Sequence, residues 1–141
     1  MEYLVYRSEA LVTPESPECQ SIVTISHLKN TLAGITGFLH AEDGVFIQYI
    51  EGPAEPLWQL YNRLHSDDRH RNLELLGHGV ISRPRFKKWR LGYSQTEIAS
   101  FRDFMGEVSA EKSLKDASCA EAVYFLMGAS VRIDLGIGSS L

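Results

Sequence analysis

Cysteine is scarce in this chain of 141 residues, which contains only Cys19 and Cys119, a hundred positions apart. Neither belongs to a Cys-x-x-Cys pair, and the five histidines are scattered along the chain and do not gather at metal-ligand spacing. These absences exclude a disulfide framework and give no metal site. The two cysteines are therefore expected to be free thiols in a reducing compartment.

Long apolar runs and net positive charge are also missing. No apolar run approaches the roughly 20 residues that a membrane span requires. The N-terminus lacks the basic region and apolar core of a signal peptide. The net charge of −4 and the isoelectric point near 5.7 do not favour nucleic acid or an anionic membrane as a partner. We expect a cytoplasmic globular protein with neither partner.

A β-hairpin is predicted around residues 35–50. Two apolar segments, 35–40 and 45–50, flank the sequence Glu-Asp-Gly, in which glycine can adopt the positive φ of a tight turn. Both segments are apolar on both faces, which indicates central strands covered on at least one side. Gln48 is the exception within them. Its amide either bonds a neighbouring loop or water, or faces a polar ligand that lies against the sheet.

The segments around the hairpin complete an alternating pattern. Further strands are predicted at 3–7, 73–81 and 89–93, one helix from Ser16-Pro17 to Gly34, and another beginning at Pro56. The order βαββαββ is ferredoxin-like. It is an α+β fold in which two helices cover one face of a mixed or antiparallel five-stranded sheet. Residues 1–94 are expected to form this domain.

Residues 95–141 differ in composition from the part before them. Phe101, Phe104 and Met105 suit a short helix, and Asp116 is expected to cap another helix through Ala120–Met127. We expect a helical appendage of short C-terminal helices packed on the free face of the sheet, followed by a frayed tail.

Catalytic patterns are not identifiable in the sequence. No nucleophile–base pair stands out, and the GITG sequence at 34–37 is neither a P-loop nor a dinucleotide fingerprint. The basic segment 83–90, with interleaved aromatic residues, is similar to RNA-binding surfaces of ferredoxin-like domains, but a solvated sheet edge explains it as well. Trp89, expected at the start of the last strand, either packs in the core or belongs to a site.

Several elements are specific only as a set: Tyr6, Asn30, GITG at 34–37, FIQYIEG at 46–52, DDRH at 67–70, and RFKKW ending at Trp89. As a set, they resemble the BLUF family of blue-light sensors that bind FAD. The resemblance covers about residues 3–94. One position departs from the family pattern, because Leu91 stands where the family commonly carries methionine.

The resemblance implies a non-covalently bound FAD between the two helices, with the edge of its ring toward the central strands. Tyr6 and Gln48 would be the photoactive pair, with Trp89 as a further candidate. Asn30 would bond the carbonyl edge of the flavin. The other positions that match cofactor-binding residues of the family are Lys29, Ile22, Arg63, Leu64, Asp67, Arg69 and His70.

The chemistry of an amide suits the role that the resemblance gives to Gln48. An amide donates at one end and accepts at the other, so its rearrangement can reverse the hydrogen bonds between Tyr6 and a flavin. The resemblance therefore implies a photoreceptor, not an enzyme. It would signal to a downstream effector protein and is expected to be a homo-oligomer. A ferredoxin-like flavin redox enzyme and an RNA-binding module using residues 83–90 remain the alternatives.

Overall fold

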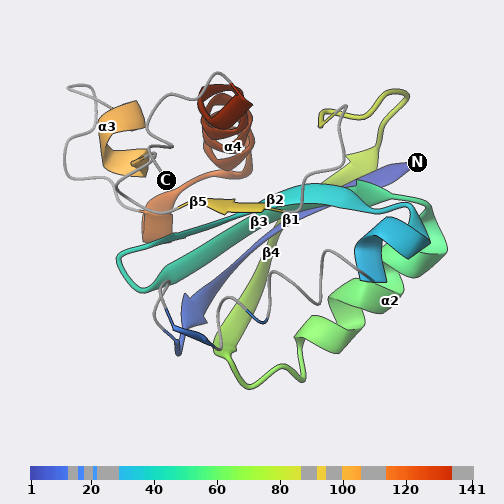
Figure 1. The fold of residues 1–141 in the computed structure, drawn as a ribbon, viewed down its shortest axis with the longest axis horizontal. Helices are drawn as coiled ribbons and strands as arrows, with labels where there is room; N and C mark the ends of the chain where they lie inside the picture. The colour runs from blue at the N-terminus through green and yellow to red at the C-terminus, as the bar shows by residue number, and fades with distance from the viewer. Residues whose placement is uncertain are drawn as a thin grey trace.

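The computed structural model describes residues 1–12, 16–17, 21, 29–86, 92–94, 100–105 and 114–134. The strands are β1 (Glu2–Ala10), β2 (Thr36–Glu42), β3 (Val45–Gly52), β4 (His70–Val80) and β5 (Gly92–Ser94). The helices are α2 (Ala54–Leu64), α3 (Phe101–Met105) and α4 (Cys119–Asp134), with a 3₁₀ turn, η2, at Leu114–Asp116. Figure 1 shows α2 on one face of the sheet and α3 and α4 on the other.

The strands form one five-stranded sheet in the order β4-β1-β3-β2-β5. Strand β1 is antiparallel to both β3 and β4, β2 and β3 form the antiparallel hairpin, and β5 joins β2 in parallel. The first four strands have the ferredoxin-like order, and β5 makes the sheet mixed. The predicted fold class is therefore confirmed.

The hairpin turn has the conformation that its sequence predicts. Asp43 and Gly44 have φ angles of 52° and 74°, and positive values at both central positions define the turn that matches the twist of two antiparallel strands. Strand β1 is longer than predicted and continues to Ala10. It does so because it pairs on both sides, with Glu9 opposite Val45 of β3 and Ala10 opposite His70 of β4.

The first predicted helix lies mostly outside the described residues. Within it, residues 29–33 are helical and lie beside α2 (Figure 1), and Ala33 packs against the apolar residues of that face. The helix ends at Gly34, as predicted. Gly34 has a φ of 73°, and the N–H of Ile35 donates to the carbonyl of Asn30 at 2.8 Å.

Strand β4 begins at His70, three residues before the predicted start, and includes the two glycines that weaken the sequence pattern. Packing restricts both positions. A Cβ at Gly77 would lie 2.5 Å from the Cys119 sulfur, and a Cβ at Gly79 would lie 3.1 Å from the ring of Tyr3. The neighbouring side chains occupy the space that larger residues would need.

The C-terminal helices pack on the sheet face opposite α2, as predicted. Val5, Phe38 and Tyr49 of the sheet share one buried apolar cluster with Phe101 and Phe125. The predicted cap of the last helix is wrong, because the helix starts later and runs to Asp134. Its N-terminus carries a reciprocal pair, in which the Glu121 N–H donates to Ser118 Oγ at 3.2 Å and the Ser118 N–H donates to Glu121 Oε1 at 2.9 Å.

Helix α2 begins at Ala54, two residues before the predicted start, and buries Leu57 and Tyr61 against the sheet. Among the described residues, no helix is long and apolar enough to cross a membrane. The predicted frayed tail lies outside the described residues.

Among the sheet glycines whose surroundings the structure describes, Gly37 on β2 leaves the least room for a side chain. A Cβ there would lie 2.1 Å from the backbone oxygen of Tyr49, so Gly37→Ala must separate β2 from β3. We expect a loss of about 3 kcal/mol or more in the free energy of unfolding, in the upper part of the range for single substitutions. Urea unfolding measures it.

The matched control is Gly128→Ala in α4, where an added Cβ meets nothing within 4 Å. This variant should be as stable as the parent or slightly more stable. Equal stabilities of the two variants would contradict the close approach of β2 and β3 at Gly37.

Candidate functional site

The site is organised around Tyr6 of β1 and Gln48 of β3, which stand opposite each other in the antiparallel ladder. Both are buried, with 3% and 6% of their surfaces exposed. The phenol of Tyr6 donates a hydrogen bond to Oε1 of Gln48. Tyr6 belongs to the buried cluster that α2 covers, together with Leu57 and Tyr61. The two residues that the resemblance pairs therefore lie on neighbouring strands, on the face that α2 covers, and are directly hydrogen-bonded.

A cavity opens beside this pair. It has about 250 Å³ of empty space, part of it open to solvent, and is lined by Tyr6, Leu39, Phe46, Leu64, Asp67 and His70. Apolar walls with a few polar groups are typical of small-molecule sites. Four of the lining residues are predicted site residues.

Leu39 and Phe46 are absent from the predicted set. Phe46 could have been found from strand alternation, because it shares a face of β3 with Gln48. Leu39 is opposite Gln48 in the pairing of β2 with β3, and only that register reveals it.

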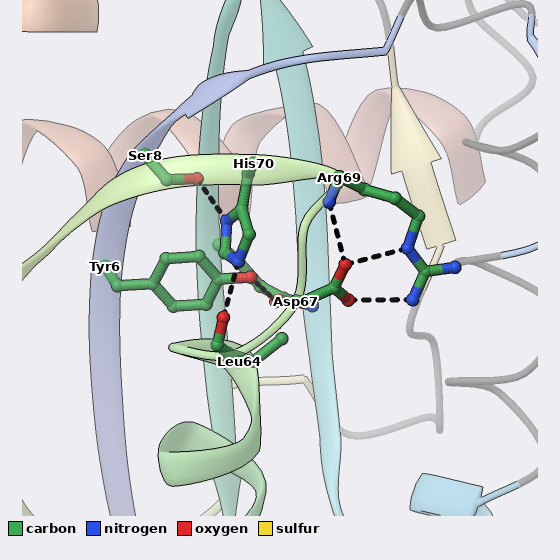
Figure 2. A network of polar contacts seen from close by, with 7 residues as sticks. Tyr6, Ser8, Leu64, Asp67, Arg69 and His70 are labelled. Carbon is green, nitrogen blue, oxygen red and sulfur yellow. Dashed lines mark hydrogen bonds and ion pairs between the residues drawn. The ribbon is translucent and has the colours of Figure 1, made fainter.

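His70 fixes one wall of the cavity. One ring nitrogen, Nδ1, lies 2.7 Å from the Ser8 hydroxyl, and Nε2 lies 2.7 Å from the backbone carbonyl of Leu64. Figure 2 shows the imidazole between these two groups and beside the ring of Tyr6, whose centroid is 6.2 Å away. Because a carbonyl can only accept, the hydrogen bond to Leu64 requires a proton on Nε2. His70 thus ties the end of α2 to β1 and β4.

Asp67 and Arg69 form a closed ion pair beside the cavity. The Asp67 carboxylate accepts from Nε of Arg69 at 2.9 Å, from Nη2 at 2.7 Å, and from the Arg69 backbone N–H at 3.0 Å (Figure 2). These hydrogen bonds lower the pKa of Asp67 below its usual value. The carboxylate is thus held in its charged form next to Tyr6.

The pKa of Tyr6 is raised well above that of an ordinary tyrosine. Burial is the main cause, and the negative charge of Asp67 and the neighbouring Tyr61 add to it. Tyr6 is therefore a neutral phenol throughout the physiological pH range.

Asn30 carries a buried donor that the described residues do not satisfy. Its side chain is 2% exposed, and Nδ2 has no hydrogen-bond partner among the described residues. Leaving a buried donor unpaired costs about 1–3 kcal/mol. An acceptor atom of a ligand would remove that cost, so this amide fits a cofactor with a carbonyl edge.

The remaining predicted residues divide into two groups. Lys29 and Arg63 are exposed, so their charges are accessible to a ligand. Ile22, Trp89 and Leu91 lie outside the described residues. Among the described residues, no group of three or more histidine, cysteine, aspartate or glutamate side chains could hold a metal ion.

The comparisons with known proteins identify the class as flavin-based blue-light photoreceptors. Residues 1–92 match the family described as "BLUF: Sensors of blue-light using FAD". The match covers well over half of the sequence. The chain belongs to the BLUF family.

Two curated relatives and one solved structure agree with this assignment. The chain is 32% identical over 74 residues to the blue light- and temperature-regulated antirepressor BluF of Escherichia coli K12, and 30% identical over 91 residues to photoactivated adenylate cyclase subunit alpha of Euglena gracilis. These matches cover 52% and 62% of this chain, but only 18% and 9% of the relatives' lengths. The dark-state structure of BlrB, a BLUF protein, has a TM-score of 0.72 and 25% identity, over 99% of this chain and 96% of that one.

The family membership confirms the predictions of a blue-light sensor and of FAD as cofactor. It does not favour the flavin redox enzyme or the RNA-binding module. The cavity, the buried amide of Asn30 and the Tyr6–Gln48 pair are consistent with a bound flavin ring.

The raised pKa of Tyr6 predicts how stability depends on pH. A tyrosine in the unfolded chain ionises near pH 10, whereas Tyr6 in the folded chain stays neutral beyond that pH. The stability due to the buried neutral phenol is therefore complete below about pH 9 and is lost as the pH rises further.

We expect the difference in unfolding free energy between the parent and Tyr6→Phe to be constant up to about pH 9 and then to shrink by about 1.4 kcal/mol per pH unit above pH 10. Urea unfolding over this range measures it, and the ionisation of the other tyrosines cancels in the difference. A difference that stays constant through the alkaline range would show that Tyr6 titrates normally.

Proposed function

We propose that the isoalloxazine ring of FAD lies in the cavity against Tyr6 and Gln48, and that light acts on the protein through this pair. The observation that carries the proposal is the buried hydrogen bond from the Tyr6 phenol to the Gln48 amide at the wall of the cavity. When bound, the flavin supplies the absorption of blue light and the capacity to accept one electron.

Tyr6 is the electron and proton donor. Its phenol is neutral, and the fixed negative charge of Asp67 stabilises any positive charge that develops on the ring. The phenolic proton is directed at Oε1 of Gln48. Loss of an electron makes a phenol strongly acidic, so the proton moves along this bond.

Gln48 converts the electron and proton loss of Tyr6 into a rearrangement of hydrogen bonds. In the structure the amide accepts from Tyr6 through its oxygen, and its NH₂ group is the donor end. When the amide turns or tautomerises, the end that faced Tyr6 as an acceptor becomes a donor, and the end that faced the flavin changes in the opposite sense. The hydrogen bonding of the site then changes without any covalent change.

The other residues hold the cofactor. Asn30 would donate Nδ2 to the carbonyl edge of the ring, and Leu64 and Ile22 would hold the ring through apolar contacts. Lys29, Arg63 and the Asp67–Arg69 pair bind the polar part of the cofactor. Both ring nitrogens of His70 are hydrogen-bonded within the protein. His70 therefore shapes the cavity wall, and only its ring carbons are left to contact the cofactor. Trp89 remains a further candidate for the photoactive group.

The domain division supports a route for the signal. Residues 1–94 would be the sensor, and residues 95–141 the element that passes the signal on, since α3, η2 and α4 pack directly on the opposite sheet face. The names of the relatives describe an antirepressor and a cyclase, so members of this family act with effectors. We propose an effector protein here too, reached by direct contact or by a change in homo-oligomer assembly, in the cytoplasm and without nucleic acid or membrane.

Tyr6→Phe and Gln48→Leu test the photochemical proposal. Each replaces a polar group by an apolar one of similar size within a buried layer, so both variants should fold and bind FAD. Both should lose the reversible red shift of the flavin spectrum under blue light. Tyr6→Phe should also make the flavin more fluorescent, because its quencher is gone.

Difference spectra under blue light, with flavin occupancy measured in the dark, give the result. Tyr124→Phe is the matched control, because Tyr124 is 67% exposed on α4, and it should behave like the parent. A normal reversible red shift in flavin-loaded Tyr6→Phe or Gln48→Leu would overturn the mechanism.

Asn30→Ala tests the orientation of the cofactor. Removing one hydrogen bond to the flavin should weaken FAD binding about tenfold. The flavin-free variant should be no less stable than the parent, because the substitution deletes a buried donor that has no partner among the described residues. Flavin titration and urea unfolding measure the two effects. Unchanged affinity would mean that Asn30 does not face the cofactor.

A further inference from the structure

Three aromatic side chains on the face that α2 covers form a continuous series from the site toward the surface. The ring centroid of Tyr61 lies 6.3 Å from that of Tyr6, and 5.8 Å from that of Trp58. These separations are those of aromatic rings in direct contact. Tyr6 and Tyr61 are buried, and Trp58 is partly buried at the edge of the same cluster.

The outer end of the series carries a proton acceptor. The indole N–H of Trp58 donates to Oε1 of Glu2 at 3.1 Å, and the ring of His78 packs edge-on against the indole at a centroid distance of 5.4 Å. A tryptophan that loses an electron becomes a strong N–H acid. A carboxylate already bonded to that N–H can take the proton without any movement of the backbone.

We propose that Tyr61 and Trp58 form an electron relay that restores Tyr6 after its oxidation, an inference that rests on the proposed function. The photoexcited flavin is the oxidant and takes one electron from Tyr6, whose proton passes to Gln48. One electron then moves from Trp58 through Tyr61 to Tyr6, and Tyr6 regains its proton from Gln48. Trp58 is left one electron short, and its indole proton passes to Glu2, so charge and atoms balance.

The ring of Tyr61 connects two groups that have hydrogen-bonded proton acceptors, Tyr6 with Gln48 and Trp58 with Glu2. Tyr61 is oxidised only transiently, because the electron from Trp58 restores it. The stable site of the oxidation is the indole, at the end of the series farthest from the flavin.

The relay gives the light reaction a second branch. In the first branch, the electron returns directly to Tyr6 and the site switches. In the second branch, an electron from Trp58 regenerates Tyr6. Trp58 is then the oxidised residue, and the flavin keeps its extra electron. This branch lowers the yield of switching and keeps Tyr6 from remaining oxidised under strong light.

The test is blue illumination of the FAD-loaded full chain with a nitrone spin trap, which forms a covalent bond to an indolyl radical. Mass spectrometry of the peptides then locates the adduct. The adduct is expected on Trp58 and not on Trp89, the other tryptophan of the chain. Tyr61→Phe keeps the ring but not the easily oxidised phenol, and should lower the Trp58 adduct about tenfold, equivalent to ~1.4 kcal/mol in the barrier.

Two variants complete the design. Glu2→Gln leaves Trp58 in place but removes its proton acceptor, so it should also lower the adduct while the red shift remains. Tyr124→Phe, on the opposite side of the sheet, should leave the adduct unchanged. Because both variants keep Trp58, their adduct measurements remain decisive even if a substitution at Trp58 itself prevents folding.

Adduct on Trp89 alone, or an undiminished Trp58 adduct in Tyr61→Phe, would overturn the relay. A normal red shift without any Trp58 adduct would overturn the relay and leave the proposed function intact. If the parent shows no red shift and Tyr6→Phe leaves the flavin fluorescence unchanged, the proposed function itself fails.

Discussion

Tyr6 and Gln48 meet because β1 and β3 pair in one register, with eight consecutive partners from Glu2–Gly52 to Glu9–Val45. Side chains alternate along a strand, so a slip of one residue would turn Tyr6 or Gln48 to the other face of the sheet. The pairing of β1 with β4 is irregular on both sides of Tyr6. The irregularity thus falls on the edge strand β4, and the ladder that holds the Tyr6–Gln48 pair stays regular.

The same alternation joins the site to the C-terminal helices. Tyr6 points to the face of α2, and the next residue, Arg7, points to the opposite face. There its guanidinium donates to the carbonyls of Leu114 at 3.0 Å and Ala117 at 3.1 Å, just before α4. On β2, the Glu42 carboxylate accepts from the Phe101 N–H at 2.8 Å. The central strands therefore contact the proposed cofactor on one side and anchor the C-terminal segment on the other.

The sequence predicts the parts of this structure that local patterns determine. Alternation and the Asp-Gly turn predict the hairpin, and the order of elements predicts the ferredoxin-like sheet. What the sequence could not predict depends on tertiary contacts. The glycines of β4 are explained only by the sulfur of Cys119 and the ring of Tyr3, and Leu39 joins the cavity only through the register of β2. The engagement of both His70 nitrogens likewise needs Ser8 and the end of α2 to be brought together.

The charge of Asp67 acts in two opposite ways on the proposed oxidation of Tyr6. A negative charge opposes loss of a proton from a neutral phenol, which is why it raises the pKa of Tyr6. The same charge favours loss of an electron, because the product is positive. Since the proton is directed at Gln48 within an existing hydrogen bond, it moves a short distance and stays beside the phenol. Arg69 holds the carboxylate in its charged form, so this electrostatic bias is built into the fold before light arrives.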